Sequence, residues 1–125
     1  MKKVVLKTYN ITKKYGEQLA VDNVNMTIKK GDIYGFIGQN GAGKTTLIRL
    51  ITGLIHKSGG EIELLGANEE NELNKARTMV GSLIETPSFY TNMTARENLE
   101  VSRLVRDIPG KKCIDEVLDL VGLKD

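Results

Sequence analysis

Residues 38–45 read GQNGAGKT, which fits the pattern G-x-x-x-x-G-K-[ST]. In this pattern the glycines allow successive backbone N–H groups to turn inward and surround a polyphosphate. Lys44 would then reach the β- and γ-phosphates, and the Thr45 hydroxyl would complete the ligand shell of a bound Mg²⁺. The stretch therefore predicts a P-loop, the loop that holds the phosphates of a nucleoside triphosphate.

The flanking sequence supplies the strand and the helix that a P-loop requires. Residues 32–37 (DIYGFI) are mostly apolar and rich in strand-forming residues, which predicts a buried strand. Apolar residues then recur at helical spacing as far as Leu54, and Gly53 is placed to end this helix. The helix N-terminus would direct its N–H groups and positive dipole end at the phosphates. A glycine turn without a ligand is the alternative; a Rossmann site fits less well, because no G-x-G-x-x-G occurs.

The composition indicates one domain with an ordinary surface. The chain has 125 residues, of which 40% are hydrophobic and 27% are charged. A net charge of +2 gives no sign of a nucleic-acid-binding surface, so we expect no nucleic-acid partner. The single cysteine, Cys113, excludes an internal disulfide and favours a reducing compartment. No apolar run approaches the roughly 18 residues of a membrane span, so we expect a cytoplasmic protein without direct membrane insertion.

Periodicity predicts the other elements. Alternating or continuous apolar runs predict strands at 3–12, 21–28, 61–66 and 79–84, with turns at 15–18 and 29–32. Helices are predicted at 71–77, at about 94–105 and around 114–121, the second opened by the capping box of Thr94 and Glu97. Gly122 and Leu123 would close the last helix in a Schellman-like end. Strands dominate before Thr86 and helices after it.

Taken together, these residues resemble the ATP-binding subunits of ABC transporters over essentially the whole chain. The likeness is carried by Tyr15-Gly16, by residues 20–24, by the P-loop with Thr46, by residues 54–66 and by residues 87–99. It implies an α/β fold: a P-loop NTPase core with an N-terminal antiparallel β subdomain and the start of the ABC helical subdomain. Residues 1–125 would be the N-terminal part of the nucleotide-binding domain, with the β-rich subdomain and P-loop core at 1–85 and the helical part at 86–125.

The resemblance also implies an ATP-binding site. Tyr15 would stack on the adenine ring, and Thr46 would offer its N–H and hydroxyl to the α-phosphate. Val21 would help to hold the base or ribose, although it could equally be a core valine. The expected ATP contacts are Tyr15, Val21, Asn40, Gly41, Ala42, Gly43, Lys44, Thr45 and Thr46.

Glu85 departs from the common pattern of the family, which has glutamine here, in contact with Mg²⁺ and the attacking water. Residues 82–87 (SLIETP) instead resemble the bacitracin-resistance and lantibiotic-immunity branch, which carries glutamate. A carboxylate can ligate Mg²⁺ or polarise a water. The resemblance thus assigns catalysis to Lys44 and Glu85, and metal binding to Thr45 and Glu85. One alternative is a solvated glutamate at a strand end; another, a degenerate Walker B strand, conflicts with the fit of residues 87–99.

The family's serine-glycine-glycine signature, Walker B carboxylates and switch histidine do not occur at matching places, and the sequence ends about where the signature region should begin. We therefore expect a shortened subunit that binds MgATP with negligible turnover. The intact protein would be an ATPase that works as a dimer, at the inner face of the cell membrane, through transmembrane permease subunits. Export is the expected direction, and the Glu85 region suggests a peptide antibiotic as cargo. The alternatives are a catalytically inactive nucleotide-binding or interaction module, prone to self-association, and a soluble non-transport ABC protein of translation or DNA repair.

Overall fold

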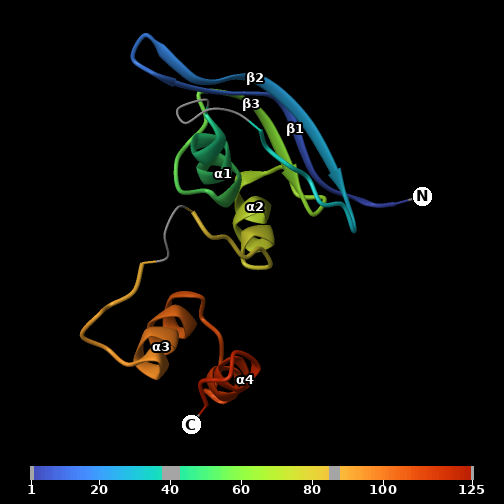
Figure 1. The fold of residues 1–125 in the computed structure, drawn as a ribbon. Coiled ribbons are helices and arrows are strands. Elements are labelled where there is room, and N and C mark those ends of the chain that lie inside the picture. Colours follow the sequence, from blue (N-terminus) through green and yellow to red (C-terminus); the bar gives the residue numbers. More distant parts are fainter. Residues whose placement is uncertain (1, 38–42, 85–87, 125) are drawn as a thin grey trace. The chain divides into compact units, whose positions relative to one another are not determined.

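A computed structural model describes residues 2–37, 43–84 and 88–124. The chain forms two compact units, Met1–Glu85 and Thr86–Asp125, and each is described by itself. The elements of the first unit are β1 (Val4–Tyr15), β2 (Gln18–Lys29), α1 (Lys44–Thr52), β3 (Gly59–Leu64) and α2 (Glu70–Arg77) (Figure 1). The second unit contains α3 (Ala95–Val105) and α4 (Lys112–Leu120).

The first unit is built on an antiparallel sheet with the strand order β2-β1-β3. A turn at Gly16 joins β1 and β2 into a long hairpin, and β3 occupies one edge of the sheet, so the strands predicted at 3–12, 21–28 and 61–66 are confirmed. The predicted helices at 47–54 and 71–77 correspond to α1 and α2. One core joins these elements; its larger members are Leu6, Ile11, Val21, Met26, Leu47, Leu50, Ile51, Ile62, Leu64 and Leu73.

A β-bulge in β1 changes which of its residues face this core. The pairing with β2 moves from Thr8↔Met26 to Ile11↔Val24, so β1 contains one extra residue between these pairs. Neighbouring residues of a strand face opposite sides, and an extra residue therefore reverses the alternation. Leu6 and Thr8 are buried before the bulge, and Ile11 is buried after it. The outer half of β1 thus directs its odd-numbered residues to the core face.

A compensating bulge lies in β2. Between the pairs Ile11↔Val24 and Lys13↔Val21, the extra residue belongs to β2. Val21 becomes a core residue, 4% exposed. On β1, alternation from Ile11 brings Lys13 and Tyr15 to the same face as Ile11. The two bulges together therefore place Tyr15 and Val21, both predicted nucleotide contacts, on one side of the hairpin.

Three asparagines and a glycine hold the bulges. Asn10 and Asn23 both have φ of 49°, in the left-handed region that asparagine tolerates better than most residues. The Asn10 amide donates to Asn25 Oδ1 at 2.9 Å, and Asn25 Nδ2 donates back to Asn10 Oδ1 at 2.9 Å. On the other side, a Cβ on Gly60 would lie 2.3 Å from the Asn10 carbonyl oxygen. Only glycine allows β3 to approach the bulge so closely.

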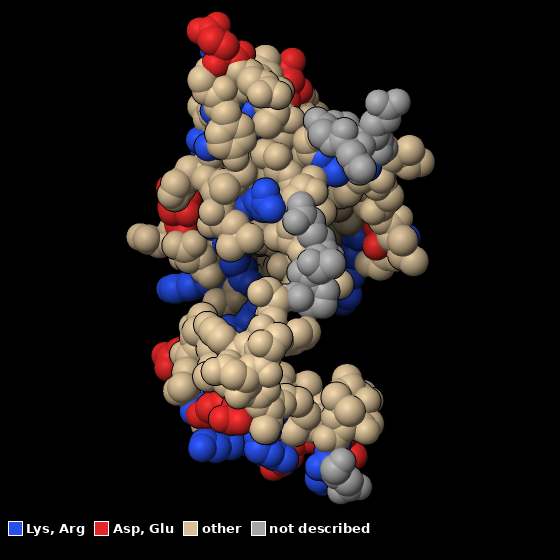
Figure 2. Space-filling view, turned by 60° about the vertical axis from the view of Figure 1, so that its left-hand side comes forward, with Lys and Arg blue, Asp and Glu red and all other residues tan. Residues whose placement is uncertain are grey.

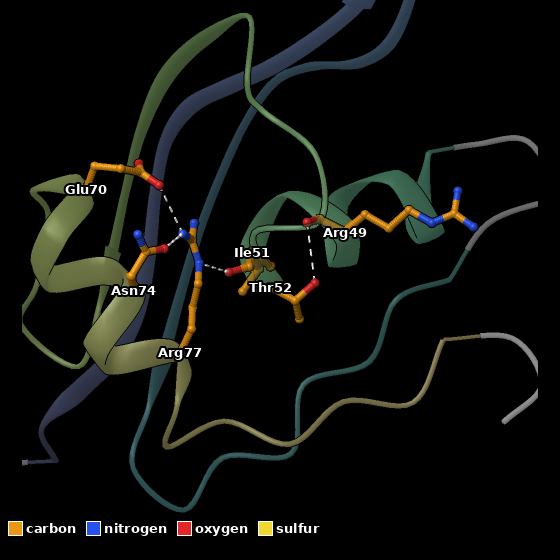
Figure 3. Close-up of polar contacts among 6 residues, drawn as sticks. All are labelled: Arg49, Ile51, Thr52, Glu70, Asn74 and Arg77. Atoms are coloured by element: carbon orange, nitrogen blue, oxygen red, sulfur yellow. Dashed lines mark hydrogen bonds and ion pairs between the residues drawn. The ribbon is translucent and has the colours of Figure 1, made fainter. Parts of the chain in front are cut away.

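Arg77 of α2 forms a hydrogen bond with the C-terminal end of α1 (Figure 3). Its Nε donates to the Ile51 carbonyl at 3.2 Å, and its Nη1 donates to Glu70 at 3.2 Å and to Asn74 at 3.0 Å. A cation is favoured here because the helix C-terminus carries partial negative charge and carbonyls without intrahelical partners. The guanidinium lies so near Gly53 that a Cβ there would be 2.9 Å from it. The P-loop helix is therefore held at its far end by a second helix.

The second unit confirms two predictions about its helix ends. The capping box of α3 is present: Glu97 N donates to Thr94 Oγ1 at 3.1 Å, and Thr94 N donates to Glu97 Oε1 at 3.0 Å. The Schellman end of α4 is present as well, with Leu123 N donating to the Leu118 carbonyl at 2.8 Å and Gly122 in the left-handed region. An ion pair of 2.7 Å between Arg96 and Asp115 joins the two helices.

Two predicted strands are wrong. Residues 32–37 and 79–84 form no strand in the structure, and Ile33 and Ile37 are fully exposed. The physical reason is the distance along the chain between a strand and the strand that pairs with it. β1 and β2 are joined by a short turn and pair with each other, whereas a buried strand of parallel type needs partners from distant parts of a chain. The described residues contain no strand that pairs with either segment.

Candidate functional site

The N-terminus of α1 is arranged to receive an anion. Gly43 is its N-cap residue, with φ of 94° and ψ of 3°, and the Leu47 amide donates to the Gly43 carbonyl at 2.9 Å. The first amides of a helix have no intrahelical acceptors. Gly43 has no side chain that could accept from them, and the first turn of α1 carries no acidic residue. The positive end of the helix dipole adds to the attraction for negative charge.

Residue 43 must be glycine for two independent reasons. Its φ lies in the left-handed region, where a side chain is strained. In addition, a Cβ on Gly43 would lie 2.3 Å from the Ala20 carbonyl oxygen and 3.5 Å from Val21 Cγ2. The end of the P-loop is thus packed directly on β2. This contact brings Val21, a predicted nucleotide contact, next to the start of α1.

A hollow of about 580 Å³ opens in front of this contact. Its size falls in the range of about 300–1,000 Å³ that is usual for small-molecule sites. The hollow is lined by residues of β2, of the segment 32–37 and of the start of α1. They include Val21, Gly43 and Lys44. Thr45 and Thr46, half-buried, follow in the first turn of α1. The structure therefore gathers five of the predicted ATP contacts within or beside one hollow.

Tyr15 lies at the end of β1 and is 51% exposed. It does not line the hollow, so the structure does not bring it into contact with the other predicted residues. Its ring is covered by a neighbour from the same strand: Lys13 Nζ lies 5.0 Å from the ring centroid. The role of Tyr15 as the adenine platform stays a prediction.

The remaining predicted residues, Asn40, Gly41, Ala42 and Glu85, lie outside the described residues. The proposed partnership of Lys44 with Glu85 in catalysis, and of Thr45 with Glu85 at Mg²⁺, therefore stays a prediction. Within the described ranges, no group of three or more His, Cys, Asp or Glu side chains could hold a metal ion. The first turn of α1, with a threonine hydroxyl and no carboxylate, fits a cation that arrives already bound to phosphate oxygens.

Charged side chains of both signs are spread over the face drawn in Figure 2, and the lysines and arginines do not merge into one continuous area. The formal net charge of the chain is only +2. A long-range field that steers anions needs a concentrated excess of one sign. We therefore expect the attraction for a polyphosphate to be local, from Lys44 and the helix N-terminus.

Sequence reasoning missed two residues that contact α1 or a predicted site residue. Arg77, which holds the far end of α1, gives no signal in the sequence beyond a basic residue in the last turn of a helix. Lys13 precedes Tyr15 by two positions, and strand alternation could have placed the two side chains on one face.

Among the described residues, no helix is both long enough and apolar enough to cross a membrane.

Comparison with known proteins agrees with this geometry. The family model described as ABC transporter matches residues 21–125. The chain is 48% identical over 120 residues to the bacitracin transport ATP-binding protein BcrA of Bacillus licheniformis, covering 96% of this chain and 39% of BcrA. It is 38% identical over 120 residues to the lantibiotic transport ATP-binding protein SrtF of Streptococcus pyogenes, covering 95% of this chain and 50% of SrtF.

Solved structures agree on the fold. A dimeric post-hydrolysis state of the ATP-binding cassette MJ0796, bound to ADP and Pi, matches with a TM-score of 0.75 at 28% identity, over 92% of this chain and 56% of that one. The ATP-binding subunit of an ABC transporter matches with a TM-score of 0.71 at 27% identity, over 83% of this chain and 43% of that one. The chain thus has part of the P-loop fold of ABC ATPases, an antiparallel β subdomain plus helices, and spans about two fifths of BcrA. From its residues, its fold and its relatives, the chain belongs to the ABC transporter family, as the N-terminal part of an ATP-binding domain.

Proposed function

We propose that the chain binds MgATP through the P-loop and the first turn of α1. The observation that carries the proposal is the left-handed Gly43, packed on the Ala20 carbonyl at the start of a helix that begins with Lys44, Thr45 and Thr46. A glycine held so tightly at a helix N-terminus exposes backbone N–H groups to a ligand, which is what a phosphate requires.

Each residue has a distinct role in the proposal. Lys44 neutralises the β- and γ-phosphates, and the Thr46 N–H and hydroxyl bind the α-phosphate. The Thr45 hydroxyl and the Glu85 carboxylate hold Mg²⁺, which neutralises charge on the phosphate oxygens when it is bound. Val21 contacts the base or ribose, and Tyr15 stacks on adenine.

The intact protein would hydrolyse ATP as a dimer of ATPase subunits and drive transmembrane permease subunits from the inner face of the cell membrane. Support for a transport role comes from the relatives, whose names assign them to bacitracin transport and to lantibiotic transport. Support for dimerisation comes from the dimeric cassette structure that matches over 92% of this chain. We infer export of a peptide antibiotic as the transport task, with resistance to that antibiotic as the benefit.

Isothermal titration calorimetry with MgATP tests the nucleotide site. We expect saturable binding to the 125-residue chain and at least tenfold weaker binding for Lys44→Ala, since a hydrogen bond to a charged group is worth about 1.5–3 kcal/mol. Lys30→Ala is the matched control, because Lys30 is an exposed turn lysine with the same charge, and it should bind like the wild type. Equal affinities of all three proteins would refute the proposed site.

Turnover is tested separately by phosphate release. We expect a negligible rate from this chain, because it lacks the family's Walker B carboxylates and signature motif. A steady-state rate comparable to that of an intact ABC ATPase, abolished by Lys44→Ala, would contradict the expectation.

A second function, a self-associating interaction module, is favoured by one observation. Ile33 and Ile37 are fully exposed, and Met79 is 80% exposed, in the two segments that form no strand. Exposed apolar side chains on backbone without strand partners favour association between copies. Size-exclusion chromatography with and without MgATP separates the two functions. A constitutive oligomer that Ile33→Asp converts to monomer would support the module, whereas a monomer whose elution responds to MgATP would support the nucleotide site.

A further inference from the structure

Lys13 makes two contacts that join different parts of the first unit. Its ammonium nitrogen lies 5.0 Å from the centroid of the Tyr15 ring, the distance of a cation–π contact. The same nitrogen donates to the His56 carbonyl at 2.6 Å. His56 belongs to the loop between α1 and β3. One side chain thus connects the hairpin end to the loop that follows the P-loop helix.

This loop is itself fixed to β1. Ser58 N donates to the Thr12 carbonyl at 2.8 Å, and the Lys14 amide donates to Ser58 Oγ at 2.9 Å. The His56 carbonyl is therefore held at a defined place beside the strand that carries Lys13. Because the carbonyl anchors the ammonium group, that group stays over the Tyr15 ring without help from a bound phosphate.

A second lysine–tyrosine pair occurs on the same strand with the same spacing. Lys7 Nζ lies 4.9 Å from the centroid of the Tyr9 ring, and Tyr9 is 40% exposed. The β1 bulge lies between the two pairs, so Lys7 and Tyr9 stand on the face opposite to buried Leu6 and Thr8, while Lys13 and Tyr15 share the face of buried Ile11. The two pairs are alike in contact geometry and differ in the face that they occupy.

We propose that Lys13 is a positioning residue that fixes the Tyr15 ring for a nucleotide base. An aromatic ring has two faces; the ammonium group covers one, and the other is left for the base to stack on. A side chain held in one rotamer pays less entropy when a ligand binds than a mobile one does. This inference rests on the proposed function, in which Tyr15 receives adenine.

The competing role for a lysine near a nucleotide is a direct contact with phosphate. The two roles differ in the ligands they affect: a base-positioning lysine acts on ATP and leaves inorganic tripolyphosphate untouched, whereas a phosphate-binding lysine acts on both. Comparing these two ligands therefore separates positioning from electrostatic attraction.

The test measures dissociation constants of the 125-residue chain for MgATP and for magnesium tripolyphosphate. Lys13→Met keeps the apolar stem and removes the charge. We expect about threefold to fivefold weaker binding of MgATP, because the Tyr15 ring must then be ordered when the base binds, and unchanged binding of tripolyphosphate. Lys13→Arg should restore the affinity, because a guanidinium can both cover the ring and donate to the carbonyl. In a Tyr15→Ala background, Lys13→Met should have no further effect.

Lys7→Met is the matched control, since it removes the same charge from the same kind of pair on the other face. It should leave both affinities unchanged. The inference is overturned if Lys13→Met leaves MgATP affinity unchanged, if it weakens tripolyphosphate equally, or if Lys7→Met has the same effect. If instead the wild type binds neither ligand, or Lys44→Ala binds both like the wild type, the proposed function itself fails and the inference falls with it.

Discussion

Two helices of this chain begin in opposite ways. At α3, the hydroxyl of Thr94 accepts from the Glu97 amide, and the Glu97 carboxylate accepts from the Thr94 amide. At α1, the N-cap residue is Gly43, which has no side chain, and the first turn has no acidic residue. The capping box therefore supplies internal acceptors for two amides at the start of α3, whereas Gly43 offers no side-chain acceptor at the start of α1.

The difference shows how one local element serves either stability or binding. A capping box adds stability and occupies the helix N-terminus with the chain's own carboxylate. A glycine start gives up that stabilisation and keeps the positive end available for a ligand's negative charge. The tight packing of Gly43 on Ala20 then holds the uncapped start in place.

The largest expected effect comes from Gly43→Ala, which replaces the N-cap glycine of α1. The new methyl group would lie 2.3 Å from the Ala20 carbonyl oxygen, on a residue with φ of 94°. Left-handed strain costs about 1–3 kcal/mol, and displacement of α1 from β2 adds to it. We expect urea denaturation to show that the free energy of unfolding falls by at least this amount. We expect calorimetry to show more than tenfold weaker MgATP binding.

Gly16→Ala is the control for strain alone, because Gly16 has φ of 58° and nothing within 4 Å of a Cβ. It should destabilise the hairpin and leave MgATP affinity close to that of the wild type. Wild-type affinity in Gly43→Ala would show that the packing of Gly43 on β2 is irrelevant to binding.

A smaller effect is expected from Thr94→Ala, which removes the capping box of α3. Loss of an N-cap threonine costs about 1 kcal/mol. Amide hydrogen exchange should show faster opening of α3, while calorimetry should show unchanged MgATP affinity. Thr94→Ser keeps the hydroxyl and should retain the protection. A drop in MgATP affinity with Thr94→Ala alone would mean that the two helix starts are not independent.

The smallest effect is a pH response confined to α3. Hydrogen bonds from the Thr94 backbone amide, and then from its side chain, lower the pKa of Glu97 below its ordinary value of 4.5. A lowered folded-state pKa stabilises the fold above pH 4.5, and this contribution is lost as the pH falls through the lowered value. NMR spectra recorded from pH 6 to pH 3 should show the Thr94 amide shifting only below pH 4.5. Glu97→Gln should flatten this response, and a midpoint above 4.5 would contradict the account.

The sequence predicted most of the elements from local patterns, including β3, whose partner β1 is distant along the chain. The turn between β1 and β2, the end of α1 at Gly53, the Thr94 capping box and the Schellman end of α4 all depend on residues a few positions apart. Hydrophobic alternation and capping residues carry that local information directly. The strands predicted at 32–37 and 79–84 have no partner strand among the described residues, whereas β3 pairs with the distant β1. The apolar pattern of a segment does not show whether such a partner exists, and for these two segments the prediction was wrong.

The candidate site also has features that the sequence predicted and features that only the fold shows. The P-loop pattern identified Gly43, Lys44 and Thr45 without help from the fold. The packing of Gly43 on Ala20, the bulges that bring Tyr15 and Val21 to one face, and the clamp of Arg77 on α1 are tertiary contacts. Hydrophobic periodicity does not predict them, because they depend on how separate elements pack or pair in the fold.

An NMR titration of the chain with magnesium tripolyphosphate, observed at the two helix starts, tests directly whether α1 begins as a phosphate site. We expect large shifts of the Gly43, Lys44, Thr45 and Thr46 amides and no shift of the Thr94 and Glu97 amides, which already have acceptors within the capping box. Unchanged amides at the start of α1, or equal shifts at both helix starts, would contradict the claim that α1 begins as a phosphate site.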